Sequence, residues 1–97
     1  MAAEENQEAR HPGRRRYACA DGAIEIAVEG TDQWHALAVC LGRPELAYEG
    51  SWEAARRAPA DGPLAAVIAS MLAEDTAQSW RRRLTTRGVP CVTVQAE

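Results

Sequence analysis

The chain has 97 residues, a formal net charge of −3 and a hydrophobic content of 46%. This length fits one domain with a modest core, and the negative net charge disfavours nucleic acid as a general partner. No apolar run approaches the roughly 20 residues that a membrane-spanning helix needs, and the acidic N-terminus lacks the apolar stretch of a secretion signal. We therefore expect a cytoplasmic protein that binds neither nucleic acid nor membrane.

The first segment, residues 1–13, is polar. Its composition is typical of a disordered N-terminal tail. Three arginines follow, Arg14, Arg15 and Arg16. One interpretation is the solvated edge of a strand, and the other is a contact to phosphate, for example in coenzyme A or a nucleotide. These arginines are therefore the candidate cofactor-binding residues.

Residues 17–28 have the pattern of a β-hairpin. Two β-prone runs are separated by Asp21-Gly22, a pair that favours type I′ turns because both central positions need positive φ. Such a turn pairs Ala20 with Ala23 and places one set of alternating residues on a buried face. These residues are Tyr17, Cys19, Ile24, Ile26 and Val28.

Three helices are predicted after the hairpin. Thr31 can cap the first, and Gly42 can end it. Ser51 can cap a short second helix over residues 52–58. Asp61 can cap the third, which we expect to be the best buried. The apolar stripes are Trp34, Leu37, Ala38 and Leu41 in the first helix, and Leu64, Val67, Ile68, Met71 and Leu72 in the third.

A last helix and a strand end the chain. Thr76 can cap this helix, and Trp80 and Leu84 lie four residues apart on one face. Gly88 can end it in a left-handed conformation. The β-prone run Cys91 to Val94 follows.

The last helix also contains Arg81, Arg82 and Arg83. Adjacent residues point about 100° apart on a helix, so the three do not form one surface. The interpretation that we favour is a solvated face whose aliphatic stems cover apolar surface.

The order of these elements predicts a small α+β domain over residues 14–97. The β-hairpin and the C-terminal strand form a small sheet, and three to four helices pack on one face of it. The order of the strands and the direction of the third strand stay open.

No catalytic constellation is evident. The sequence has no glycine-rich phosphate loop, no GxSxG and no HExxH. Of its two histidines, His11 lies in the predicted tail, and His35 has no evident acid or cysteine partner. The cysteines are odd in number and widely spaced within apolar patterns, which favours buried, inert thiols in a reducing cytoplasm over a zinc site. We therefore predict no catalytic residue and no metal site. The cysteines are Cys19, Cys40 and Cys91.

A set of motifs in fixed order resembles a known family. The hairpin with Asp21-Gly22 is followed by LGRPEL at 41–46, by the apolar helix at 64–72, and by GVPC at 88–91. Thr76, Trp80 and Leu84 precede the last motif. From residue 17 to 94 this order resembles the small domain of the family III CoA-transferases, which include formyl-CoA transferase, carnitine CoA-transferase and α-methylacyl-CoA racemase.

The resemblance implies that catalysis belongs to another domain. In the family, a large Rossmann-like domain supplies most of the coenzyme A site and the catalytic aspartate, and these 97 residues do not contain it. No catalytic residue carries over to this sequence. The resemblance therefore implies that the chain alone binds no cofactor, and that coenzyme A is a ligand only by family likeness.

The sequence departs from the family pattern in three places. A single glycine, Gly13, stands where the family often has a glycine-rich loop before the first strand. The usual proline after GVPC is missing. Ser79 stands where an acid usually precedes the Trp, so we expect the helix to lose the reciprocal contact of a capping box. These departures fit a domain released from active-site duties.

Three functions are compatible with these patterns. The first is a stand-alone homologue of the small domain, non-catalytic alone, that acts as a binding or assembly module by self-association or by docking on a large-domain subunit. The alternative is a subunit or fragment of a split CoA-transferase or acyl-CoA racemase, active only with a separate large domain. The third is a small-molecule binder that uses its arginines for phosphate.

Overall fold

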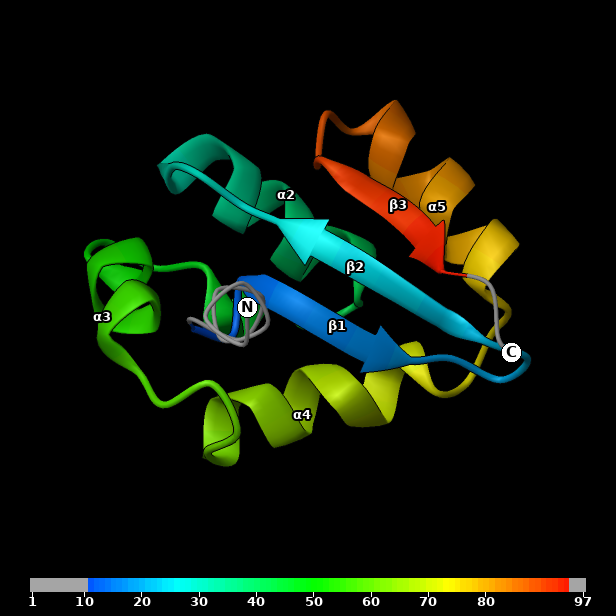
Figure 1. Cartoon of the computed structure of the whole chain (residues 1–97). Helices are drawn as coiled ribbons and strands as arrows, with labels where there is room; N and C mark the ends of the chain where they lie inside the picture. The colour runs from blue at the N-terminus through cyan, green and yellow to red at the C-terminus, as the bar shows by residue number, and fades with distance from the viewer. Residues whose placement is uncertain (1–10, 95–97) are drawn as a thin grey trace, which may run out of the picture.

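A computed structural model describes residues 11–94 of the chain (Figure 1). In these residues, three strands form an antiparallel sheet in the order β1-β2-β3. The strands are β1 (Arg14–Ala18), β2 (Ala23–Ala27) and β3 (Cys91–Val94). The helices are α2 (Thr31–Cys40), α3 (Ser51–Arg57), α4 (Pro63–Leu72) and α5 (Ala77–Thr86), with a short 3-10 turn, η1 (Pro44–Leu46).

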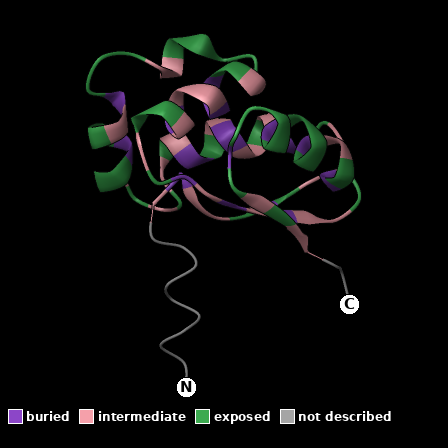
Figure 2. Cartoon of the chain, turned by 90° about the horizontal axis from the view of Figure 1, so that it is seen from above, coloured by how far each residue is buried: buried purple, intermediate pink, exposed green. Residues whose placement is uncertain are grey.

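The helices lie on one face of the sheet, as predicted. In Figure 1 the sheet stands in front of the helices, and the view from above in Figure 2 shows the same two layers. The core lies between the layers, where Ile24 and Ile26 of β2 are fully buried. This arrangement confirms the α+β fold and supplies the strand order that the sequence left open.

The hairpin forms in the predicted segment, but its register is different. Ala18 pairs with Ala23 and Tyr17 with Ile24, so the prediction that Ala20 pairs with Ala23 was wrong. The expected type I′ turn is also absent, because Gly22 is not among the residues with positive φ.

The displacement of the register by two residues leaves each side chain on its predicted face. Side chains alternate between the faces with a period of two, so an even shift changes partners without changing faces. Four of the five predicted residues are buried, and Cys19 is half-buried. The buried four are Tyr17, Ile24, Ile26 and Val28.

The tip of the hairpin is held by the start of α5. The Asp21 carboxylate accepts a hydrogen bond of 3.0 Å from the main-chain N–H of Ala77. The main-chain N–H of Ala20 donates to the carbonyl of Asp75 at 2.8 Å. These two contacts hold the hairpin turn against the start of α5.

Helix capping was predicted correctly at one helix of four. The Thr76 hydroxyl accepts from the Ser79 N–H at 3.1 Å, as expected. The other helices start from a glycine without a side-chain cap, so the predicted caps at Thr31, Ser51 and Asp61 were wrong. Ser51 instead accepts from the Tyr48 N–H at 3.0 Å, outside the helix.

The reciprocal contact of a capping box is lost at α5, as predicted, because Ser79 does not accept from the Thr76 N–H, and Asp75 takes its place. Asp75, which precedes the cap, accepts from the Thr76 N–H at 2.7 Å and from the Ser79 hydroxyl at 2.8 Å. It also pairs with Arg83. These contacts, led by the main-chain hydrogen bond from Thr76, lower the pKa of Asp75.

The apolar stripes position the helices on the sheet. The stripe of α2 is buried as predicted, and Trp34 and Trp80 donate their indole N–H groups to the carbonyls of Leu46 and Leu72, both at 3.0 Å. Gly42 and Gly88 end their helices with φ of 74° and 83°, as expected. The interior side of α4 differs from the prediction, since it buries Ala65, Ile68 and Leu72, whereas Leu64, Val67 and Met71 are half-buried.

The segment just before β1 belongs to the folded unit. The predicted tail covers residues 1–13, of which residues 1–10 lie outside the described residues. Pro12 and Gly13 are buried, and Gly13 accepts a hydrogen bond from the Val28 N–H at 2.8 Å.

Within residues 11–94 no helix is long and apolar enough to cross a membrane.

We predict that Asp21→Ala lowers the free energy of unfolding by about 1 kcal/mol, because the start of α5 loses its acceptor. Urea unfolding measures the difference. Asp61→Ala is the matched control, since Asp61 is exposed and caps no helix, and it should change stability by less than about 0.5 kcal/mol. Equal losses in the two variants would show that the contact to Ala77 is unimportant.

Candidate functional site

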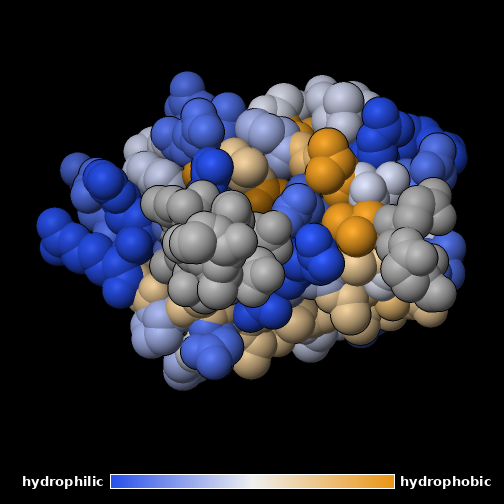
Figure 3. Space-filling view, viewed as in Figure 1, coloured by the Kyte–Doolittle hydropathy of each residue, from blue (hydrophilic) through white to orange (hydrophobic). Residues whose placement is uncertain are grey.

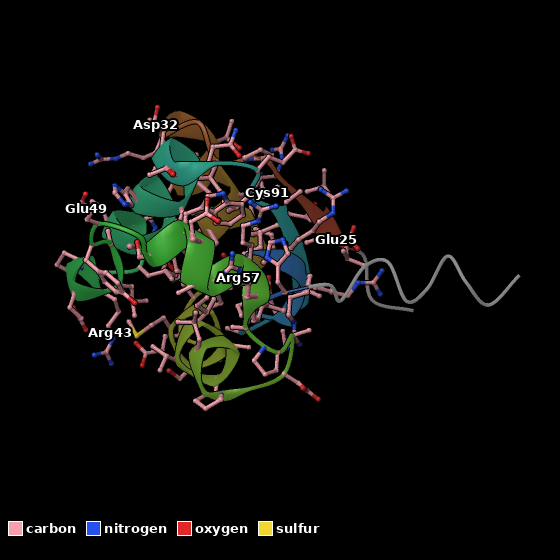
Figure 4. All side chains as sticks on the ribbon, turned by 90° about the vertical axis from the view of Figure 1, so that its left-hand side faces the viewer. Glu25, Asp32, Arg43, Glu49, Arg57 and Cys91 are labelled. Carbon is pink, nitrogen blue, oxygen red and sulfur yellow. The ribbon has the colours of Figure 1, made fainter. Side chains whose placement is uncertain are left out.

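The three candidate arginines lie along β1 and alternate between its faces. Arg14 pairs with Glu29 at 3.3 Å, and Arg16 pairs with Glu25 at 3.8 Å. Figure 4 shows Glu25 on the side of the sheet away from the helices. Because strand side chains alternate, Arg14 and Arg16 share this open face and Arg15 does not.

Arg15 is held against the chain itself. It donates to the carbonyl of Ala60 at 2.7 Å, and its guanidinium lies 4.4 Å from the centre of the Tyr17 ring. These cation–π and hydrogen-bond contacts engage the Arg15 guanidinium within the fold, so it is not available to a ligand. The structure therefore does not bring the three guanidinium groups together into one phosphate site.

A first cleft, of about 450 Å³, lies beside the N-terminal segment. Its walls include His11, Arg14, Trp52 and Arg56. The imidazole Nδ1 of His11 accepts from the Gly13 N–H at 3.2 Å, and its ring meets Trp52 edge to face. The sequence placed His11 in a tail, so it could not identify this corner.

A second cleft, of about 400 Å³, lies between the C-terminal parts of α2 and α5. It brings together two arginines of α5, the arginine that directly follows this helix, and the end of α2, which the sequence analysis did not connect. Positions i, i+1, i+4 and i+5 share one helix face. The residues from Arg82 to Arg87 have this spacing, so the sequence could have indicated that these arginines form one surface. The lining residues are Val39, Cys40, Arg82, Arg83, Thr86 and Arg87.

The three cysteines are free and half-buried. Burial raises the pKa of each thiol, and for Cys40 the nearby Arg87 and Arg83 oppose this effect. Raised pKa values keep the groups as thiols at neutral pH, and the thiolate is the nucleophilic form.

In residues 11–94 no group of three or more His, Cys, Asp or Glu residues could hold a metal ion.

Comparison with known proteins identifies the family. Residues 1–96 match the sequence profile of CoA-transferase family III. The match covers nearly the whole chain, so the chain belongs to this family.

The fold is also found within a larger protein of known structure. The crystal structure of Rv3272 from M. tuberculosis aligns with a TM-score of 0.70 at 22% sequence identity, over 98% of this chain and 28% of that chain. At this identity the likeness shows the fold alone. This chain therefore spans only a small part of the length of Rv3272. No curated protein sequence matches it significantly.

Tyr17 gives a test of the packing around the N-terminal segment. Its ring is 1% exposed, and its hydroxyl donates to the carbonyl of Pro12 at 2.5 Å. Burial raises the pKa of Tyr17, although the positive charge of Arg15 opposes the shift. The unfolded chain releases this proton near pH 10, whereas the folded chain keeps it.

We predict that stability falls as the pH rises above about 10, at up to about 1.4 kcal/mol per pH unit, because the unfolded state then binds fewer protons. The three thiols, whose pKa values are also raised, add a loss of the same sign, so Tyr17→Phe should show a smaller slope above pH 10 than the unchanged protein. At neutral pH this variant should lose about 1–2 kcal/mol because the Pro12 carbonyl loses its donor. Urea unfolding of both proteins between pH 8 and 11 under reducing conditions measures the difference. Parallel pH profiles would contradict the role of Tyr17.

Proposed function

We propose that this domain is a non-catalytic assembly module that docks the open face of its sheet on the large domain of a family III CoA-transferase. The observation that carries the proposal is the composition of this face. Antiparallel sheets with one covered face normally carry polar residues on the other. Five of the eight strand residues on this face are Ala or Val, namely Ala18, Ala23, Ala27, Val92 and Val94, and the others are Arg14, Arg16 and Glu25.

The open face has the layout of a docking surface. Val92 is 55% exposed at the edge strand β3 and is opposite Glu25, which pairs with Arg16. Figure 3 views this face and shows hydrophobic side chains between groups of hydrophilic ones. Exposed apolar residues beside charged ones are typical of protein–protein contacts.

The length of the solved relative supports a large domain as the occupant. This chain aligns with only 28% of that protein, so in that protein the equivalent unit belongs to a much larger body. We infer that a comparable body covers the open face here. Self-association of the module is the competing outcome that the test below separates.

The chemical groups of the module support a non-catalytic role when it is alone. The thiols have raised pKa values, and the Tyr17 hydroxyl is bound to Pro12. The three free cysteines fit a reducing, cytoplasmic compartment. On this proposal the module alone has no cofactor, and coenzyme A would meet it only in a complex.

The alternative is that the complex is a split CoA-transferase or acyl-CoA racemase whose activity requires this module. The family match supports it, because the matching family consists of CoA-transferases. Assay of the purified complex for transfer of coenzyme A between two carboxylic acids separates the two functions. Activity that appears only when the module is present favours the split enzyme, and unchanged activity favours an assembly role.

We predict that the module forms a complex with a family III large domain whose own small domain has been deleted, and that Val92→Glu weakens this complex at least tenfold. A carboxylate that becomes buried in the contact at this position must be desolvated without a partner. Light scattering after size-exclusion chromatography and a binding titration measure the two effects.

Val39→Glu is the matched control, since Val39 is similarly exposed at 48% but lies at the α2–α5 cleft. This variant should bind the large domain as the unchanged module does. If the module forms a homodimer and Val92→Glu dissociates it, the open face binds a second copy of this chain and not a large domain. A monomer that binds no large domain would overturn the proposal.

A further inference from the structure

The α2–α5 cleft concentrates positive charge in a chain that is acidic as a whole. Its lining includes Arg82, Arg83 and Arg87 and no carboxylate, whereas the chain has a net charge of −3. Arg83 pairs with Asp75 and stacks over Trp80, with its guanidinium 4.0 Å from the ring centre. In the described part of the chain, Arg82 and Arg87 form no ion pair.

The cleft beside the N-terminal segment lacks this unbalanced charge. Arg14 there pairs with Glu29, and Arg56 pairs with Glu53. An anion that enters that cleft would meet the carboxylate of Glu29 in its wall. The α2–α5 cleft is therefore the better anion site of the two.

The α2–α5 cleft also has an apolar wall. Val39, 48% exposed, faces it from α2 together with the Cys40 thiol. The aliphatic stems of the three arginines add further apolar surface on the α5 side. Its volume of about 400 Å³ is within the usual range for small-molecule sites, roughly 300–1,000 Å³.

From these observations we propose that the α2–α5 cleft binds a small organic phosphate, with the phosphate between Arg82 and Arg87 and the apolar part of the ligand against Val39. Guanidinium groups present planar, forked donors that match phosphate oxygens. Arg83 is engaged by Trp80 and Asp75, which leaves the two unpaired guanidiniums for the ligand. The site is separate from the open face of the sheet, so neither proposal depends on the other.

The electrostatics of Cys40 agree with this placement. Burial is the main influence on the pKa of its thiol and raises it, while Arg87 and Arg83 lower it. The field of these guanidinium groups therefore reaches a group in the wall of the cleft. A bound phosphate would experience the same field from a shorter distance.

Titration of the protein with phenyl phosphate at constant ionic strength, followed by amide chemical shifts, tests the proposal. We expect saturable shifts at the ends of α2 and α5, and weaker binding of inorganic phosphate, which lacks the apolar group. Phenol, which lacks the charge, should produce no saturable shift. The double variant Arg82→Gln and Arg87→Gln should weaken binding of phenyl phosphate at least tenfold, because a hydrogen bond to a charged group is lost at each position.

Arg81→Gln is the matched control, because Arg81 lies on the same helix and is not part of the lining. It should bind phenyl phosphate within about twofold of the unchanged protein, since the difference in net charge alone is small at constant ionic strength. A second readout is alkylation by iodoacetamide, which phenyl phosphate should slow at Cys40 and leave unchanged at Cys19 in the hairpin loop.

Two results would overturn the proposal. One is the absence of saturable shifts up to about 20 mM phenyl phosphate, a concentration well above the weak affinities expected for a ligand of this size. The other is equal weakening by the double variant and by Arg81→Gln, which would show that the protein responds to net charge and has no defined site.

Discussion

The fold depends on the contact between the hairpin tip and the start of α5. The Asp21 carboxylate accepts a hydrogen bond from the Ala77 N–H, 56 residues further along the chain. The Asp75 carbonyl accepts one from the Ala20 N–H. This contact fixes where α5 begins. Because α5 leads directly into β3, it also fixes where the third strand meets β2. The N-terminal and C-terminal parts of the chain are thus joined twice, once at a helix end and once in the sheet.

The sequence predicts faces better than it predicts partners. Alternation along the hairpin identifies Ile24 and Ile26 as interior residues, and this is independent of any even shift in register. The turn also holds Asp21 against Ala77, a partner that is invisible to a local pattern. The same reason explains the caps: Thr76 acts locally and was predicted, whereas the help that it receives from Asp75 falls outside the usual capping-box spacing.

The candidate sites also show that a local pattern does not reveal distant partners. Arg14, Arg15 and Arg16 form a conspicuous run, but the period of a strand divides them between two faces. The α2–α5 cleft was missed because Val39 and Arg82 are 43 residues apart, and nothing in either helix alone indicates that their ends meet. The spacing of Arg82, Arg83 and Arg87 could have shown a shared helix face. It could not have shown that Val39 and Cys40 supply the opposite wall.

The separation of the two surfaces follows from the two-layer architecture. A partner on the open face touches β3 from the solvent side, and a ligand in the cleft touches α5 from the side of α2. The helix α5 packs on β2 and β3 through Trp80 and Leu84, both buried. It therefore lines the cleft and also supports β3 from behind the open face. A partner that moved β3 would have to move α5 as well, because packed interiors resist small displacements. Any coupling between docking and ligand binding would therefore pass through this helix, and by linkage it would be equal in both directions.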